Sequence, residues 1–300
     1  MVIDPTTIPV AQLQGYLQAA VAPRPIAFAS TVDREGNVNL SPFSFFNIFS
    51  ANPPILVFSP ARRVTNGTTK HTLQNVLEVP EVVINIVNFA LVEQASLAST
   101  EYEKGVDEFV KAGLTAAPST TIRPPRVAES PVSFECTVEQ VIALGDQGGA
   151  GNLVVCKVQR LHIQEQYLNE KGQLDTTRLD LVARMGANWY CRANGDALFE
   201  IPKPLATKGI GVDQLPEHAR NSAILTGNNL ARMGNLEHLP TPEQRAEALA
   251  LLQQKGIATL QGAARVNAIH TLAQDCLLRG QTELALAVVC SEKLIVKSEK

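Results

Sequence analysis

The chain has 300 residues, is 45% hydrophobic, and carries a formal net charge of −3 from 26 basic and 29 acidic side chains. This is enough for one large domain, or for a domain with a smaller annex. The charge gives no bulk reason to expect binding to nucleic acid or to an anionic membrane. The N-terminus lacks a basic segment followed by an apolar one, and no later stretch approaches about 20 uninterrupted apolar residues. We therefore expect a globular cytoplasmic protein.

The sequence offers neither a metal site nor the side-chain machinery of a hydrolase. The five cysteines are odd in number, widely spaced and free of any C-x-x-C pair, which argues against a disulfide framework and against a zinc site. No nucleophile elbow, paired-carboxylate pattern, HExxH motif or Walker loop occurs. We therefore expect no metal and no catalytic side chain, with the chemistry supplied by a cofactor.

Two strands around a proline break are the most informative stretch. Residues 39–47 alternate small polar with apolar side chains, as a half-buried strand does, and Pro42 within them favours an edge strand. After the Pro53-Pro54 break, residues 55–59 are expected to form a second strand. The first strand combines three phenylalanines with serine and asparagine, a mixture that suits a flat heterocyclic ligand.

The pattern up to residue 200 predicts a mainly β, antiparallel domain. A glycine-containing turn joins a strand at 24–32 to the strand at 39–47, which is not the βαβ start of a dinucleotide-binding fold. The glycines at 145–151 join two strands, whereas a nucleotide loop would have to run into a helix. Further strands are expected at 81–87, 131–144 and 152–164, helices after Lys70 with Thr72 as N-cap, at 90–98 and at 181–185, and a surface excursion over 99–131.

The composition changes after residue 200. Residues 201–240 hold four prolines and four glycines, which predicts an irregular linker or extension after a domain at 1–200. Beyond them Ala, Leu, Gln and Glu dominate, and the TPEQ at 241–244 has the N-cap, N1 proline and capping-box glutamine of a helix start. We therefore expect residues 241–300 to form a small helical annex with a docking or dimer-stabilising role.

A second group of residues points to a phosphate ester. Hydroxyls and cations gather around the predicted helix start, where unpaired N–H groups and a partial positive charge favour an anion. A capped helix with a surface lysine explains the same residues equally well. The group comprises Ser30, Thr31, Ser59, Arg62, Lys70 and Thr72.

Several motifs in collinear order resemble the flavin reductase-like family of FMN-binding split β-barrel flavoproteins, which includes flavoredoxins. They are APRPIAFASTVDREGNVNLSPFSFFNIFSANPPILVFSPARR, KHTLQNV, VVINIVN, VDEFVKAGLT, PPRVAESPVSFEC and LDLVARMG. The resemblance covers about residues 15–200. The GIGVDQLP and LTGNNLARMGN stretches resemble those of the family's long-form members, which carry a C-terminal extension.

The resemblance implies a six-stranded antiparallel Greek-key barrel with added helices, a homodimer, and one non-covalent FMN per subunit near the dimer interface. It also assigns roles to residues: Ser44, Phe45 and Asn47 along the isoalloxazine ring, Ser30 and Thr31 near the ribityl phosphate, and Ser59, Arg62, Lys70 and Thr72 around the phosphate. Many relatives have Lys-Asp-Thr where this chain has Lys70-His71-Thr72, so the role of the middle residue is open.

Three functions fit these observations. The resemblance implies an NAD(P)H-dependent FMN reductase, in which hydride passes from the nicotinamide to flavin N5 and the electrons go on to an acceptor. The alternatives are an FMN-binding electron carrier reduced by a protein partner, and a barrel without flavin that serves as a binding module. His162, Arg184 and Tyr190 are candidates for the nicotinamide or dimer side. A strand-surface histidine, a structural ion pair and a core aromatic are the corresponding structural interpretations.

Overall fold

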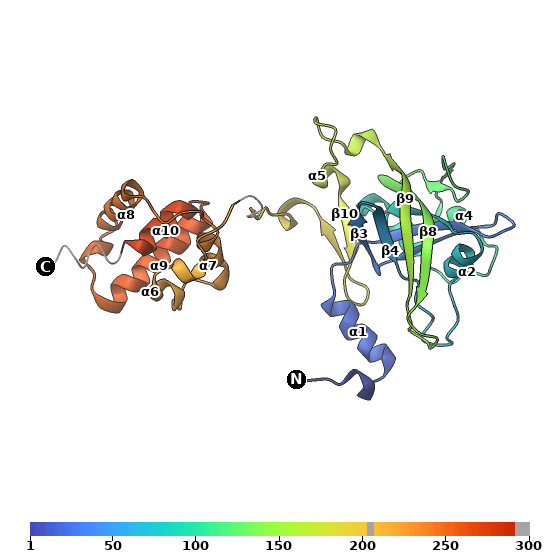
Figure 1. Ribbon diagram of the computed structural model, residues 1–300, viewed down its shortest axis with the longest axis horizontal. Helices are drawn as coiled ribbons and strands as arrows, with labels where there is room; N and C mark the ends of the chain where they lie inside the picture. Colours follow the sequence, from blue (N-terminus) through green and yellow to red (C-terminus); the bar gives the residue numbers. More distant parts are fainter. Residues whose placement is uncertain (203–206, 292–300) are drawn as a thin grey trace. The chain divides into compact units, whose positions relative to one another are not determined.

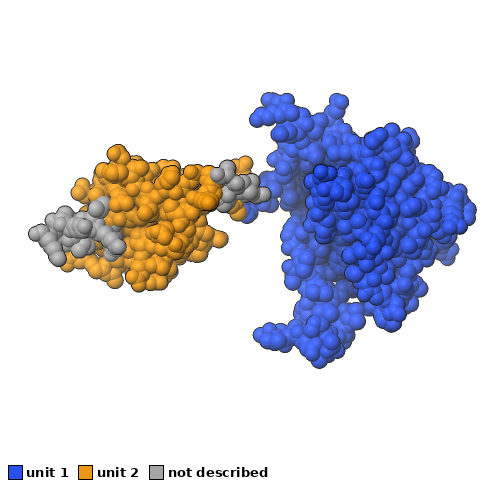
Figure 2. All heavy atoms as spheres, viewed as in Figure 1, with its two compact units in different colours: residues 1–199 blue, residues 200–300 orange. Residues whose placement is uncertain are grey.

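The computed structural model describes residues 1–202 and 207–291. These residues belong to two compact units, divided between Phe199 and Glu200 (Figures 1 and 2). The first unit is built on a β-sheet and the second is helical, and each is described by itself. Every helix among the described residues is too short or too polar to span a bilayer.

A seven-stranded antiparallel sheet forms the first unit, in the order β2-β1-β5-β8-β9-β4-β3. Strands β2 and β3 lie at opposite edges although only Ser44 and Phe45 separate them in the chain. A flat sheet of seven strands would be about 29 Å wide, far more than two residues span. The sheet must therefore curl until its edges approach, as in a split barrel (Figure 1). The strands are β1 (Ala27–Val32), β2 (Val38–Phe43), β3 (Phe46–Ala51), β4 (Pro54–Phe58), β5 (Glu81–Ile86), β8 (Val132–Ala143) and β9 (Asn152–Ile163).

The sheet has seven strands where six were expected, because residues 39–47 are not one strand. They divide at Ser44 into β2, which pairs with β1, and β3, which forms a hairpin with β4. The edge position of β2 agrees with the expectation from Pro42, which cannot donate a ladder hydrogen bond. Four other predicted strands are confirmed to within one residue at each end: 55–59 (β4), 81–87 (β5), 131–144 (β8) and 152–164 (β9).

Short helices and two small β-ribbons complete the first unit. The predicted helix at 90–98 is present as a 3-10 turn followed by α3, and the predicted surface excursion at 99–131 contains α4 and one ribbon. The elements are η1 (Pro5–Thr7), α1 (Val10–Ala20), α2 (His71–Glu78), η2 (Phe89–Leu91), α3 (Val92–Leu97), α4 (Glu108–Ala112), β6 (Ala116–Ala117), β7 (Arg126–Val127), η3 (Glu165–Tyr167), α5 (Thr176–Leu179), β10 (Leu181–Arg184), β11 (Tyr190–Ala193) and η4 (Gly195–Ala197).

Each face of the sheet has its own apolar core. Ala27 and Ala29 of β1 pack on one face with side chains of β4, β5, β8, β9 and helix α2. Phe28 points to the opposite face, where it packs with Leu40 and with side chains of α3 and α4. Successive residues of a strand face opposite sides of the sheet, so β1 is buried along its whole length. Helix α2 is thus fixed on one side of the sheet, and α4 on the other.

Residues 181–185 contain strand β10 and not the predicted helix. Asp175 caps the short helix α5, and Asp180 ends it in the left-handed region with a φ of 50°. The next four residues pair with β11, and Arg184 also exchanges two backbone hydrogen bonds of 2.9 Å with Arg24. The strand is therefore set by partners distant in the chain, which a run of five residues cannot reveal.

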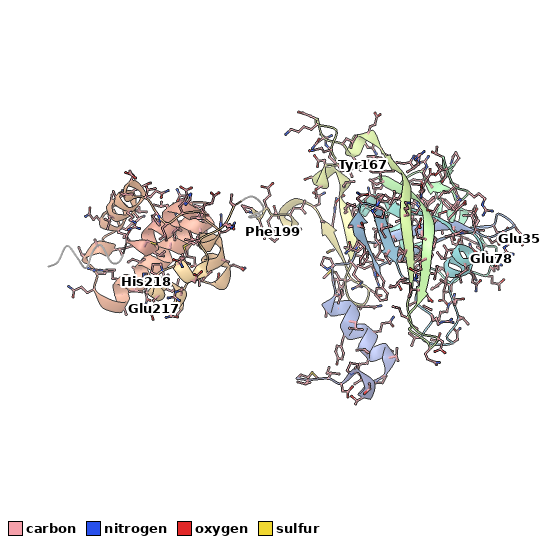
Figure 3. All side chains as sticks on the ribbon, viewed as in Figure 1. Glu35, Glu78, Tyr167, Phe199, Glu217 and His218 are labelled. Carbon is pink, nitrogen blue, oxygen red and sulfur yellow. The ribbon has the colours of Figure 1, made fainter. Side chains whose placement is uncertain are left out.

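The described part of the second unit is a helical bundle around one apolar core, to which every α-helix contributes buried side chains. Helix α8 begins with the predicted capping box, in which Thr241 and Gln244 bond to each other's backbone. His218 of α6, labelled in Figure 3, stacks on His270 of α9 with 5.2 Å between ring centroids. The elements are η5 (Val212–Gln214), α6 (Glu217–Arg220), α7 (Gly227–Gly234), α8 (Pro242–Gln254), η6 (Ile257–Thr259), α9 (Gly262–Leu278) and α10 (Thr282–Cys290).

The described residues between 207 and 240 do not form the predicted irregular linker. Helices α6 and α7 lie here, and Leu225 and Met233 are buried in the core of the second unit. The glycines permit close backbone contact rather than disorder of the chain: a Cβ at Gly209 would lie 2.5 Å from the carbonyl oxygen of Gly234. The helical unit therefore begins well before residue 241.

Gly209→Ala should destabilise the second unit by about 1–3 kcal/mol, the usual cost of overpacking a close-packed site. The matched control is Gly227→Ala at the first residue of α7, where a Cβ meets no atom within 4 Å. Thermal unfolding followed by far-ultraviolet circular dichroism measures both variants. Equal melting temperatures for the two would contradict the packing argument.

Candidate functional site

A pocket lies beside the start of α2, between strand β2 and the segment 98–102; its empty space, open solvent at the mouth included, is about 310 Å³. Two of the predicted site residues, Lys70 and Thr72, line it. Apart from Ala98, polar and charged side chains supply the remaining wall, namely Asn39, Ser41, Arg63, His71, Ser99, Thr100, Glu101, Tyr102 and Glu108. The pocket therefore has the chemical character of a site for a polar, charged group.

Two cations of this pocket share one carboxylate. Oε1 of Glu101 accepts a hydrogen bond from Arg63 Nε at 2.7 Å and lies 3.2 Å from Lys70 Nζ. The hydrogen bonds from Arg63 and then Lys70 hold the pKa of Glu101 below its ordinary value. Arg63 Nη1 also donates to Thr68 Oγ1 at 2.9 Å and to the carbonyl of Thr69 at 2.8 Å. The guanidinium and the ammonium group thus converge on a single anionic group.

His71, the first residue of α2, adds a titratable group to the same wall. Partial burial lowers its pKa, and the nearby charges of Arg63, Lys104 and Lys70 lower it further. The imidazole is therefore neutral at neutral pH, and the fixed positive charges on the wall of this pocket are those of Arg63 and Lys70.

Thr72 is not the N-cap of α2, as was predicted, because Lys70 holds that position. Thr72 is fully buried, and its hydroxyl donates to Asn39 Oδ1 at 2.7 Å. Asn39 Nδ2 donates in turn to one carboxylate oxygen of Glu108, and the Leu40 N–H donates to the other, both at 2.9 Å. Burial raises the pKa of Glu108, while these two hydrogen bonds oppose that effect. The hydroxyl of Thr72 is thus committed to a buried polar chain that links α2, β2 and α4.

Ser30 and Thr31, expected near the ribityl phosphate, do not line the pocket. Both are fully buried within β1. Thr31 Oγ1 accepts a hydrogen bond from Asn75 Nδ2 at 3.1 Å, whereas Ser30 Oγ has no hydrogen-bond partner among the described residues. The hydroxyl of Thr31 therefore joins β1 to α2.

Ser59 and Arg62 follow the end of β4. Ser59 Oγ accepts a hydrogen bond from the Asn152 N–H at 3.1 Å, and the Ser59 N–H donates to the Phe45 carbonyl at 2.8 Å. Arg62 Nη1 donates to the Gly67 carbonyl at 3.1 Å, but its buried Nε has no partner in the described part of the chain. Ser59 thus ties strands together, while Arg62 retains a buried donor that a ligand oxygen would satisfy.

The residues expected along the isoalloxazine ring lie where β2 gives way to β3. Ser44 is half-buried, Phe45 is 38% exposed, and Asn47 is exposed with its Oδ1 accepting the Ile48 N–H at 2.8 Å. Ile48 and Phe49 are 64% and 68% exposed. The edge strand therefore presents apolar surface beside hydroxyl, amide and backbone polar groups.

Arg24 fixes the position of this stretch and was not predicted as a site residue. Its buried guanidinium donates to the carbonyls of Gln18, Val21 at 2.6 Å and Met185 at 2.9 Å. Its Nε lies 3.4 Å from Ser44 Oγ. Arg24 therefore joins the end of α1, the β10–β11 turn and the break between β2 and β3. A lone arginine between two prolines carries no local sequence signal of this role.

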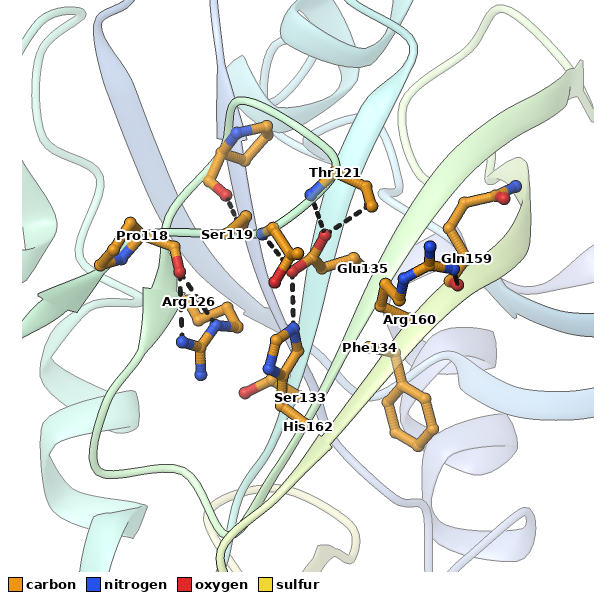
Figure 4. A network of polar contacts seen from close by, with 12 residues as sticks. Pro118, Ser119, Thr121, Arg126, Ser133, Phe134, Glu135, Gln159, Arg160 and His162 are labelled. Atoms are coloured by element: carbon orange, nitrogen blue, oxygen red, sulfur yellow. Dashed lines mark hydrogen bonds and ion pairs between the residues drawn. The ribbon is translucent and has the colours of Figure 1, made fainter.

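His162, predicted for the nicotinamide side, belongs to a buried polar network (Figure 4). Its Nε2 lies 2.6 Å from Glu135 Oε1. Glu135 is fully buried on β8 and accepts further hydrogen bonds from the N–H groups of Thr120 and Thr121, at 2.6 and 2.7 Å, and from the Thr121 hydroxyl at 2.6 Å. Burial raises the pKa of Glu135, but the hydrogen bonds outweigh burial and bring it to about 2. Glu135 thus ties the segment containing Thr120 and Thr121 to strand β8, and His162 of β9 contacts the same carboxylate.

Arg184 and Tyr190, the other two candidates, contact each other across the β10–β11 ribbon. The Arg184 guanidinium lies 4.6 Å from the centre of the Tyr190 ring, and its Nη2 donates to the Ala187 carbonyl at 2.7 Å. Tyr190 is 37% exposed and the adjacent Trp189 is 76% exposed. The tyrosine is therefore not a core aromatic, and the ribbon presents aromatic surface beside a cation.

Arg63, Glu101 and Glu108 are charged residues of the pocket wall that were not predicted as site residues. Arg63 directly follows the predicted Arg62, while the two glutamates lie in the stretch interpreted as a surface excursion. Arg63 and Glu101 are 38 residues apart in sequence, so no local pattern shows that they pair. The sequence signal that could have pointed to Arg63 is the cluster of basic residues at 62–70.

Comparisons with known proteins relate the first unit to a flavin reductase-like family and to solved structures. Residues 20–178 match the family model of the flavin reductase like domain. An uncharacterized protein of Halalkalibacterium halodurans is 35% identical over 192 residues, covering 63% of this chain and 91% of that protein. Nitrilotriacetate monooxygenase component B from Bacillus cereus has a TM-score of 0.62 and 30% identity, over 67% of this chain and 98% of that one. The 2-nitrobenzoate 2-nitroreductase of Pseudomonas fluorescens has a TM-score of 0.58 and 27% identity, over 70% and 100% of the two chains.

The matched region contains every strand of the seven-stranded sheet and every residue of the pocket. The mainly β split-barrel fold expected from the sequence motifs is therefore confirmed. Because the family model covers more than half of the 300 residues, the chain belongs to the flavin reductase-like family of flavoproteins.

Proposed function

We propose that the protein is an FMN-dependent oxidoreductase that takes its electrons from NAD(P)H. The observation that carries the proposal is the continuity of two surfaces. The pocket with Arg63 and Lys70 includes Ser41 of β2, and the exposed edge with Phe45 begins at the end of the same strand. A cationic pocket beside an apolar and polar edge strand is what a phosphorylated flat ring requires.

The donor set fits FMN at both ends. Arg63 and Lys70 would hold the phosphate through charge-assisted hydrogen bonds, and the unpaired Nε of Arg62 is a further donor nearby in sequence. Ser41 and Ser44 lie about 10 Å apart along an extended chain, a separation that the ribityl chain between phosphate and ring can bridge. Phe45 would contact the ring, with Ser44 and Asn47 as hydrogen-bonding groups at its edge.

Bound FMN would supply the redox chemistry, accepting a hydride from the nicotinamide and passing electrons to an acceptor. The chain's own residues bind, orient and exclude water, and none is proposed as a catalytic acid or base. The aromatic and cationic surface at Arg184 and Tyr190 is the proposed nicotinamide side, since an arginine over an aromatic ring suits a flat, phosphorylated ligand. His162 is a weaker candidate, because Glu135 already engages its Nε2.

A homodimer is part of the proposal. Strand β3 is a sheet edge, and its Ile48 and Phe49 are largely exposed. Unpaired edge strands with apolar side chains are normally covered in native proteins. A second copy of the chain over this edge would cover the apolar side chains and close the ring site from one side.

The purified protein is expected to be yellow, to behave as a dimer in light scattering, and to lose its flavin absorbance within one turnover when mixed anaerobically with NADH or NADPH. Stopped-flow absorbance with each nucleotide separately measures the reduction. A yellow protein that neither nucleotide bleaches would contradict the reductase and favour an electron carrier reduced by a protein partner. A colourless protein that takes up no added FMN would contradict flavin binding altogether.

A further inference from the structure

Glu101 places a negative charge where the proposed function requires a phosphate. Its side chain is 57% exposed, whereas those of Arg63 and Lys70 are only 17% and 29% exposed. The residues around it form turns without a regular helix or strand. The two cations are thus held by the body of the unit, and the carboxylate reaches them from an exposed loop.

Two of the three nitrogens of the Arg63 guanidinium already make hydrogen bonds, and one of them bonds Glu101. Nη1 is committed to Thr68 and Thr69, and Nε donates to Glu101. A phosphate oxygen that bonds Nε must therefore displace the carboxylate. A phosphate that instead binds Lys70, or Nη2 of Arg63, with Glu101 still in place would sit next to a like charge and be repelled.

We propose that Glu101 is an internal competitor for the FMN phosphate and thereby sets the selectivity of the site for phosphate monoesters. The proposal rests on the function proposed above. A phosphate monoester carries a charge of about −1.5 to −2 at pH 7 and three acceptor oxygens, so it outcompetes a carboxylate for two cations. A singly charged ligand gains little over Glu101. The residue would therefore exclude weaker anions while it lowers FMN affinity below the maximum that the cations allow.

The test compares the wild-type protein, Glu101→Gln and the matched control Glu103→Gln, by fluorescence titration with FMN and with riboflavin. Glu103 is exposed and makes no ion pair within residues 1–202 and 207–291, so its substitution changes the net charge alone. The expected result is that Glu101→Gln binds FMN about 3- to 30-fold more tightly. The phosphate then no longer has to displace a carboxylate that contacts both Arg63 and Lys70. Riboflavin affinity, and both affinities of Glu103→Gln, should not change.

Each other outcome overturns the inference in a recognisable way. Weaker FMN binding by Glu101→Gln would make Glu101 a residue that orders the cations. Unchanged FMN binding would show that the phosphate does not contact Arg63 and Lys70 together. An equal gain for riboflavin would place the effect at the ring. Absence of FMN binding in all three proteins would overturn the proposed function and this inference together.

Discussion

Replacing Arg63 and Lys70 together with alanine should weaken FMN binding by about 2–4 kcal/mol, which is about 30- to 1,000-fold in the dissociation constant. Each charge-assisted hydrogen bond contributes about 1.5–3 kcal/mol. The net loss of binding free energy is smaller than the sum for two cations, because the phosphate must displace Glu101 from them. Riboflavin, which has the ring but no phosphate, should bind both proteins equally. Fluorescence titration with the two flavins measures the difference.

The matched control for this pair is Arg34→Ala with Lys171→Ala. Both residues are exposed and neither forms an ion pair in the described part of the chain, so the control removes the same formal charge from elsewhere on the surface. If both double variants lose the same FMN affinity, the effect arises from long-range electrostatics and not from direct contact with the phosphate. No loss in either would move the phosphate away from this pocket, with the unpaired Nε of Arg62 as the next candidate.

Thr72 is left out of the variant although the sequence motifs place it at the phosphate. Its hydroxyl donates to Asn39, and Asn39 donates to the buried Glu108. Removing the hydroxyl would leave an acceptor on Asn39 unpaired inside the protein, at a cost of about 1–3 kcal/mol in stability. A loss of FMN binding by Thr72→Ala would therefore not distinguish phosphate contact from a disturbed pocket wall.

The elements that sequence patterns predicted correctly are those whose signal is local. Strands β5, β8 and β9 carry β-branched and alternating residues throughout, and each is present to within one residue of its predicted ends. The start of α8 needs only Thr241, Pro242 and Gln244, whose side chains and backbone satisfy one another. Short-range hydrogen bonds and side-chain alternation suffice in these cases.

The elements that were missed depend on distant partners. Leu181–Arg184 is apolar enough for a helix, and only its pairing with β11 and Arg24 makes it a strand. The glycines between 207 and 240 resemble those of a linker, yet Gly209 and Gly234 are in close backbone contact. Composition cannot distinguish a glycine that loosens the chain from one that allows two segments to touch.

The candidate site likewise has residues that local sequence features predict and residues that only the folded structure brings together. Lys70 was predicted because it precedes a helix start, which is a local feature, and it does line the pocket. The partners that set its electrostatics, Glu101 and Arg63, come together only in the folded protein. Resemblance to a family places residues near a ligand, but it does not show which side chains already satisfy one another. That distinction separates Lys70 from Ser59 and Thr31, whose hydroxyls are committed to the structure.

The buried carboxylate of Glu135 should make the first unit sensitive to acid. Its folded-state pKa is about 2, against an ordinary value of 4.5. A depressed pKa contributes stability that is fully present above the unfolded value and is lost as pH falls from about 5 toward 2. The expected loss is about 2–3 kcal/mol of unfolding free energy. Urea titrations at pH 7, 5 and 3, monitored by hydrogen exchange of peptides from β8 and β9, measure it.

Glu135→Gln separates this carboxylate from all other acids in the chain. At pH 7 the variant should be less stable by about 3–5 kcal/mol, because an amide nitrogen replaces an oxygen that accepts bonds from Thr120, Thr121 or His162. Its stability should also vary less between pH 5 and 3 than that of the wild type. Glu139→Gln, at an exposed position on the same strand, is the control and should behave as the wild type. If Glu135→Gln loses as much stability on acidification as the wild-type protein, the acid sensitivity arises elsewhere. The network in Figure 4 would then be only a packing element.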